Sequence, residues 1–178
     1  KQTSANKVWI TFQSMDLMQL CGAVKNLYDD ATAMEQPQEI LVDVIGLGSG
    51  VVDRLAEQNL PVRGVNVAEA PSTKKNYLNL RAELWFAVKD WLAQRDCRLP
   101  ENDELASELA APQYKYTSTG KIKIESKDEM RKRGIKSPDK ADALALTMAS
   151  SAASFGGSQS YLGYNFKKPL KSRIFRVG

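Results

Sequence analysis

A mostly apolar run at residues 39–45, followed at once by a glycine-rich segment, most constrains the fold of this 178-residue chain. An apolar run of strand length is typical of a strand covered on both faces, as in a parallel sheet. Strand-like runs also lie at residues 8–12 and 62–67, and a helical pattern follows each of the three runs. This alternation predicts an α/β fold with a mostly parallel sheet.

Two helices are clearly predicted, one by a capping box and one by an apolar stripe. Asp16 and Gln19 have the spacing of a capping box, so a helix is expected from Asp16. A longer amphipathic helix is expected over residues 79–95. Its apolar stripe consists of Leu80, Leu84, Trp85, Val88, Trp91 and Leu92.

The second half of the chain predicts two more helices and a hairpin. The helices are expected at residues 103–110 and 138–150, and the hairpin forms around Gly120. Residues 151–160 are small and polar, which is typical of a flexible break, and a basic tail follows. The expected organisation is one domain over residues 1–150, with the break and the tail over 151–178.

Composition excludes several kinds of chemistry. The chain has no histidine, which rules out Ser-His-Asp and Cys-His catalysis and zinc sites built on imidazole. Its two cysteines, Cys21 and Cys97, lie in separate helical patterns and are expected to be reduced. No apolar run approaches the ~18 residues of a membrane span, and no signal-peptide pattern opens the sequence. The chain is therefore expected to be a globular intracellular protein without membrane contact.

A pair of carboxylates at the start of the last predicted helix is the first candidate site. Ser137 is expected to be the N-cap and Pro138 the first helical residue. Asp139 and Asp142 then share one helix face, with Cβ atoms roughly 5–6 Å apart. That face could be half of a site for a hard cation. Alternatively, the two acids complement the helix dipole.

Asp43 changes the balance between these readings, because it lies within the apolar run at 39–45. An ionised side chain there needs a partner, which could be a divalent cation or a set of structural hydrogen bonds. If Asp43, Asp139 and Asp142 converge, they can hold Mg²⁺ or Mn²⁺, which prefer oxygen ligands. Two such ions activate water for phosphodiester hydrolysis. Lys127 or Lys140 could neutralise charge on the phosphate or be a surface residue, and the surface reading is favoured for Lys140.

The glycines that follow Asp43 allow a different interpretation. Gly46, Gly48 and Gly50 could cradle a phosphate, and Glu69 lies near the position of the acidic residue in dinucleotide-binding domains. The G-x-G-x-G spacing departs from the G-x-G-x-x-G fingerprint. A nucleotide site therefore remains open as an alternative.

Basic residues are concentrated at residues 121–140, which contain eight Lys and Arg but only four acidic residues. Such clusters suit a polyanion, although a solvated face is an equally common reason for them. The candidate DNA contacts are Lys127, Arg131, Lys132 and Arg133.

Five segments in this order resemble the nuclease domain of tailed-bacteriophage terminase large subunits. They are residues 40–50, 63–67, 79–85, 122–127 and 134–144, and the resemblance spans about residues 8–150. It implies an RNase H-like fold, with a mixed central sheet flanked by helices. It also implies a two-metal endonuclease that cuts concatemeric double-stranded DNA during packaging. Asp43, Asp139 and Asp142 would form the catalytic metal site, with Asp43 and Asp139 as metal ligands and Asp142 as a nearby acidic residue.

The resemblance further implies a terminase small subunit and a portal as partners, in the cytoplasm of the infected bacterial host. One departure stands out. The family's first aspartate and its strand have no counterpart before Lys7, and Asp16 occupies a helix-cap position. No Walker A motif is present, so a fragment of a longer protein is expected. The alternatives are a non-catalytic DNA-binding or packaging-assembly module, a nucleotide-binding enzyme, and an RNase H-like resolvase or integrase.

Overall fold

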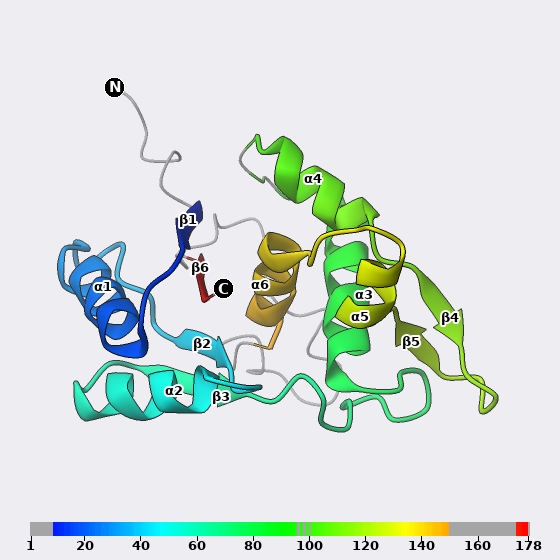
Figure 1. Cartoon of the computed structure of the whole chain (residues 1–178), viewed down its shortest axis with the longest axis horizontal. Helices are drawn as coiled ribbons and strands as arrows, with labels where there is room; N and C mark the ends of the chain where they lie inside the picture. Colours follow the sequence, from blue (N-terminus) through cyan, green and yellow to red (C-terminus); the bar gives the residue numbers. More distant parts are fainter. Residues whose placement is uncertain (1–8, 96, 98, 100, 150–173, 178) are drawn as a thin grey trace. The chain divides into compact units, whose positions relative to one another are not determined.

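The structure is a computed structural model that describes residues 9–95, 97, 99, 101–149 and 174–177 (Figure 1). The chain divides into two compact units. The first contains the residues up to Asn66 together with those from Ala149 onward, and the second is Val67–Met148. None of the helices within the described residues is long and apolar enough to cross a membrane.

The first unit is built from two parallel strand pairs and two helices. Strand β2 pairs with β3 so that Ile40 lies opposite Val62 and Asp43 opposite Val65. Strand β1 pairs with β6, which comes from the far end of the chain. The elements of this unit are β1 (Trp9–Phe12), α1 (Leu17–Asp29), β2 (Ile40–Asp43), α2 (Gly48–Glu57), β3 (Val62–Val65) and β6 (Ile174–Val177).

Helix α1 begins where its capping box predicts. The side chain of Asp16 accepts a hydrogen bond from the backbone of Gln19, and the side chain of Gln19 accepts one from the backbone of Asp16. The buried face of α1 packs with α2 and β2 into one apolar core, which follows from its helical spacing of apolar residues. That core contains Leu20, Cys21, Val24, Ile40, Val51, Leu55 and Leu60.

The glycine-rich segment after β2 has a packing explanation. Gly46 has a φ of +76°, a left-handed conformation that suits glycine. A Cβ on Gly48 would lie 1.8 Å from the backbone oxygen of Asp43, and one on Gly50 would lie 2.7 Å from Cδ1 of Leu17. Helix α2 can therefore start at Gly48, within the glycine-rich segment, because its first turn lies directly against the end of β2.

The second unit is mainly helical. Helix α6 packs against both α3 and α4, and the hairpin β4–β5 packs on α3. The elements of this unit are α3 (Leu80–Ala93), α4 (Asp103–Ala110), β4 (Tyr114–Tyr116), β5 (Ile122–Ile124), α5 (Lys127–Lys132) and α6 (Asp139–Thr147). Its buried apolar residues include Leu80, Leu84, Trp85, Val88, Trp91, Leu105, Ile124, Met130, Leu144 and Met148.

The α/β class expected from the sequence is confirmed. The described strands form three separate two-stranded sheets, two parallel and one antiparallel. A single mixed central sheet is therefore not confirmed and stays a prediction, as does the division into residues 1–150 and 151–178. The predicted break at 151–160 lies outside the described residues, whereas β6 falls within the predicted tail.

Candidate carboxylate site

The start of helix α6 differs from the prediction in one detail. Pro138 is the N-cap, with ψ +65°, and the helix begins at Asp139. The expected cap, Ser137, instead donates its hydroxyl to Oδ1 of Asp139 at 2.7 Å. A hydroxyl that donates to a carboxylate makes a stronger hydrogen bond than one that accepts from a backbone N–H, so the bond to Asp139 takes the place of a cap. Asp139 and Asp142 nevertheless both lie in the first turn, as expected.

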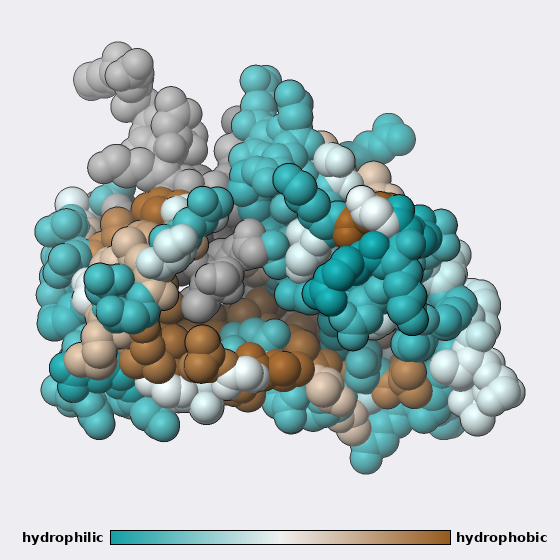
Figure 2. All heavy atoms as spheres, viewed as in Figure 1, coloured by the Kyte–Doolittle hydropathy of each residue, from teal (hydrophilic) through white to brown (hydrophobic). Residues whose placement is uncertain are grey.

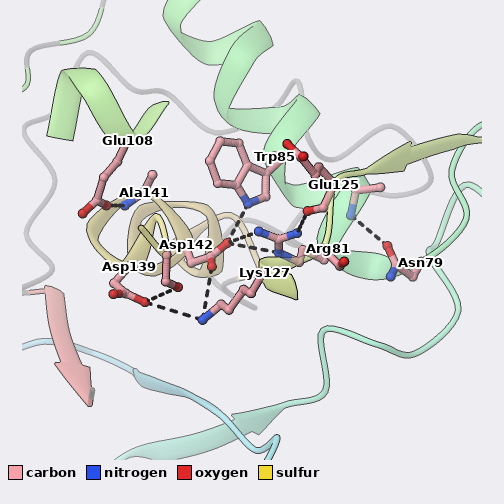
Figure 3. Close-up of polar contacts among 12 residues, drawn as sticks. Asn79, Arg81, Trp85, Glu108, Glu125, Lys127, Asp139, Ala141 and Asp142 are labelled. Carbon is pink, nitrogen blue, oxygen red and sulfur yellow. Dashed lines mark hydrogen bonds and ion pairs between the residues drawn. The ribbon is translucent and has the colours of Figure 1, made fainter. Parts of the chain in front are cut away.

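Asp142 is held by two side chains of helix α3 (Figure 3). Trp85 donates its indole N–H to Oδ1 of Asp142 at 2.8 Å, and Arg81 donates Nε to the same oxygen at 3.2 Å. Arg81 also donates Nη1 to the backbone oxygen of Glu125 at 2.7 Å, so it joins α3, α6 and the end of β5. The Asp142 side chain is 21% exposed. It is therefore a largely enclosed carboxylate with its charge compensated on one oxygen.

The second oxygen of Asp142 faces a different environment. Among the described residues, Oδ2 is buried and receives no hydrogen bond. The Nζ of Lys127 lies 3.5 Å from this atom and 3.5 Å from Oδ1 of Asp139 (Figure 3). A single cationic group thus lies between the two predicted carboxylates. The side chain of Lys127 is half exposed, so it can move away from them.

Helix α4 supports the start of α6 from another side. Glu108 accepts a hydrogen bond from the backbone N–H of Ala141 at 2.9 Å. This bond matters because α6 has no side-chain cap of its own. Burial raises the pKa of Glu108, with backbone hydrogen bonds from α6 acting in the opposite direction. Glu104 binds Lys140, whose side chain is only 15% exposed, so the surface reading of Lys140 was wrong.

The predicted basic cluster has partners within the protein. Arg133 makes two hydrogen bonds of 2.7 Å with the carboxylate of Glu125 and one of 3.0 Å with the backbone oxygen of Ala111. The hydrogen bond from Arg133 lowers the pKa of Glu125. Arg131 pairs with Asp128 on the exposed side of α5. The DNA contacts predicted for Lys127, Arg131, Lys132 and Arg133 stay a prediction, and Arg133 additionally has a structural function.

Asp43 is the last residue of β2 and not the middle of a longer strand. Its Oδ1 accepts a hydrogen bond from the backbone N–H of Ile45 at 3.1 Å, and its side chain is half-buried. Asp43 belongs to the first unit, whereas Asp139 and Asp142 belong to the second. The structure therefore brings together Asp139, Asp142 and Lys127, and the convergence with Asp43 stays a prediction.

The residues of the second unit partly fit a hard cation. Asp139 and Asp142 offer carboxylate oxygens on one helix face, and Oδ2 of Asp142 lacks a hydrogen-bond donor. These are the ligand atoms that Mg²⁺ and Mn²⁺ prefer. Within the described part of the chain, no group of three or more acids, cysteines or histidines is placed to hold a metal ion. The pair needs a further oxygen ligand to complete such a site.

Three features of this site were not predicted from the sequence. Trp85 was expected only in the apolar stripe of α3, and nothing in the local pattern reveals its bond to Asp142. Glu83 is 3% exposed and accepts hydrogen bonds from Ser72 and Thr73, which ties the preceding loop to α3. Helix α5 did have a signal, because Ser126 and Glu129 form a capping box.

The fold defined by these elements is that of the nuclease domains of phage terminase large subunits. Among the solved structures that match is the nuclease domain of the large terminase subunit gp2 of bacterial virus Sf6. It superposes with a TM-score of 0.61 at 22% sequence identity, over 76% of this chain and 74% of that one. At this identity the likeness establishes the fold. No protein-family model and no curated protein matches the chain.

Two further structures of the Sf6 domain were solved with small ligands. A K428A mutant with manganese and beta-thujaplicinol matches at 21% identity and a TM-score of 0.61, over 76% of this chain and 74% of that one. The K428A mutant with calcium matches with the same TM-score of 0.61 and 21% identity, over 77% of this chain and 74% of that one. The resemblance found in the sequence is thus confirmed at the level of fold, and the Sf6 domain is seen with divalent cations.

Proposed function

We propose that the chain is a divalent-metal-dependent endodeoxyribonuclease that cuts concatemeric double-stranded viral DNA during genome packaging. The observation that carries the proposal is the paired carboxylates Asp139 and Asp142 at the start of α6, in a chain with the fold of a terminase nuclease domain. The Sf6 structures with manganese and calcium support Mg²⁺ or Mn²⁺ as the cofactor.

In this proposal Asp139 and Asp43 are metal ligands and Asp142 is an acid of the same site. The bound metal supplies Lewis acidity and an activated water for phosphodiester hydrolysis. The protein supplies orientation, since Trp85 and Arg81 hold one oxygen of Asp142 and leave the other without a hydrogen bond. The ammonium group of Lys127 balances negative charge between the carboxylates, and can do the same for a phosphate.

The proposed substrate is double-stranded DNA, contacted through its phosphates by Lys127, Arg131, Lys132 and Arg133. Phosphate contacts carry no sequence information, which implies little sequence preference. The terminase small subunit and the portal are the proposed partners, and the cytoplasm of the infected host is the proposed compartment. The likeness to the Sf6 domain supports the DNA substrate, whereas the partners and the compartment rest on the resemblance of the sequence to terminase large subunits.

The test is cleavage of supercoiled plasmid with Mn²⁺, Mg²⁺ or EDTA. We expect nicking and linearisation with metal and none in EDTA. Asp139→Asn and Asp43→Asn should each reduce the rate at least tenfold, because each removes a charged ligand. The matched control is Asp103→Asn, which changes an exposed aspartate in the first turn of α4. Cleavage by Asp139→Asn at the control rate would contradict the assignment of the site.

A non-catalytic DNA-binding or packaging-assembly module is the second candidate. It is favoured by hydrogen bonds that the two aspartates accept from within the chain. Asp142 is bound by Trp85 and Arg81, and Asp139 is bound by Ser137. In that case the folded protein shifts duplex DNA in a gel but does not cut it in any metal. The nucleotide-binding alternative is weakened, because Gly46, Gly48 and Gly50 have conformational and packing explanations.

A further inference from the structure

A row of aromatic rings runs across the second unit from the half-buried Tyr77 and Phe86 to the exposed hairpin. The ring centroids are 5.5 Å apart for Tyr77 and Phe86, 5.3 Å for Phe86 and Tyr114, and 6.1 Å for Tyr114 and Tyr116. The last two pairs are edge-on, with interplanar angles of 86° and 79°. The row therefore ends in two rings that come from one short strand, β4.

The outer two rings are unusually open to solvent. Tyr114 is 56% exposed and Tyr116 is 66% exposed, and every residue of β4 is exposed. Tyr114 and Tyr116 lie two residues apart, so they project from the same face of the strand. That face carries Ile122 and Ile124 of β5 as cross-strand neighbours. Packing within the unit anchors the row through Phe86 and leaves its outer end uncovered.

Lysines lie in the hairpin that carries these rings and on helix α3. Residues 111–124 contain Lys115, Lys121 and Lys123 and no acid. Lys115 and Lys123 lie opposite each other on the face of the hairpin away from the two tyrosines, where both pair with Glu129. On helix α3, the Nζ of Lys89 lies 5.4 Å from the centroid of the Phe86 ring, in the same aromatic row. The side chain of Lys89 is 69% exposed and its Nζ lies 3.8 Å from Asp90, so it is a surface cation of this row that can complement a phosphate group.

We propose that Tyr114 and Tyr116 form a stacking platform for unpaired bases of single-stranded nucleic acid, with Lys89 contacting the phosphates. Exposed aromatic rings with neighbouring cations are how proteins bind single strands without reading sequence. A duplex keeps the faces of its bases stacked inside, so an intact duplex offers little to such rings. The platform is a binding surface separate from the carboxylates of α6, and it does not depend on the proposed nuclease activity.

The experiment measures binding of the full chain to fluorescein-labelled oligothymidylate and to a blunt duplex of equal length. Fluorescence anisotropy is recorded in EDTA, so that cleavage plays no part. Tyr114→Ala and Tyr116→Ala should each weaken oligothymidylate binding by about tenfold. Binding to the duplex should stay unchanged. Tyr116→Phe retains the ring and should bind oligothymidylate like the unaltered protein.

Two more variants sharpen the test. Met34→Ala removes an apolar side chain that is 80% exposed in the first unit, and should have no effect on oligothymidylate binding. Lys89→Gln should make binding less dependent on salt. The slope of log K against log salt concentration should become shallower by about 0.7, the value for one phosphate contact on a single strand. The proposal is overturned if both tyrosine-to-alanine variants bind oligothymidylate like the unaltered protein, or if they lose duplex binding equally. Loss of plasmid cleavage would contradict the proposed nuclease and leave these binding results unaffected.

Discussion

The indole Nε1 of Trp85 lies 2.8 Å from Oδ1 of Asp142, although the two residues are 57 positions apart in the sequence. Trp85 is only 7% exposed, so this bond sits at the edge of the core between α3 and α6. One carboxylate of the candidate site is therefore also part of the packing that holds the second unit together. Substitutions at Asp142 are expected to change stability as well as any activity.

Trp85→Phe tests this relationship, because it keeps an aromatic ring and removes the donor. We expect a loss of about 2 kcal/mol in the free energy of unfolding, since the bond involves a charged acceptor and its donor has no replacement. Urea denaturation of Trp85→Phe, Asp142→Ala and the double variant measures the coupling between the two side chains. We expect about 1 kcal/mol of coupling. Additive effects would show that the bond contributes nothing.

Gly48→Ala should destabilise the first unit. The added Cβ would lie 1.8 Å from the backbone oxygen of Asp43, so α2 would have to move away from the end of β2. Forced repacking of this kind costs about 1–3 kcal/mol. Gly22→Ala is the matched control within α1, because its added Cβ meets nothing within 4 Å. It should stabilise by about 0.5–1 kcal/mol. Equal urea midpoints for the two variants would disprove the close approach.

Glu108 should stabilise α6 through its bond to Ala141. Glu108→Ala removes the acceptor and is expected to cost about 1 kcal/mol, as the loss of a helix cap does. Glu108→Gln retains an acceptor oxygen and removes a carboxyl whose pKa is raised by burial, so it should cost less. Thermal denaturation near neutral pH compares the two. A larger loss for Gln than for Ala would rule out the capping role.

Acid should destabilise the protein through Glu125. The pKa of Glu125 is lowered below its usual 4.5 in the folded state, first of all by the hydrogen bond from Arg133. The folded state therefore binds fewer protons than the unfolded state, so stability from this group is present above pH 4.5 and is lost as the pH falls below it. Glu125→Gln should be less stable than the unaltered protein at neutral pH, and the difference should shrink in acid.

Urea midpoints over a series of pH values measure that difference. The control is Glu57→Gln, because Glu57 pairs with Arg54 on the surface and its side chain is 66% exposed. Such pairs contribute little at any pH. A constant gap between Glu125→Gln and the unaltered protein down to acid pH would show that the pairing with Arg133 is not responsible.

The first unit has an exposed apolar surface next to the end of β2. Figure 2 shows brown residues over the segment that joins β2 to α2. Ile45 is 56% exposed and Leu47 is 77% exposed, directly after Asp43. The sequence pattern alone suggested a fully covered strand, and β2 ends at Asp43 before the apolar run does.

Local signals in the sequence determined much of the secondary structure. Asp16 with Gln19 starts α1, and Asn79, which accepts a hydrogen bond from the backbone of Ala82, starts α3. Each of these bonds spans three residues, so the pattern is complete within one helical turn. The placement of Asp139 and Asp142 on one face followed from the same kind of local geometry.

Tertiary structure alone decided what surrounds those carboxylates. Arg81, Trp85 and Lys127 reach Asp142 from other elements, and Glu108 reaches the start of α6 from α4. No local pattern encodes these partners, because a contact between distant residues depends on how helices pack and not on their spacing in the chain. The sequence by itself determined which residues could bind a cation or a nucleic acid. The packing of α3, α5 and α6 decided which oxygen atoms of Asp142 are already held by the protein, because Arg81 and Trp85 come from α3 and Lys127 comes from α5.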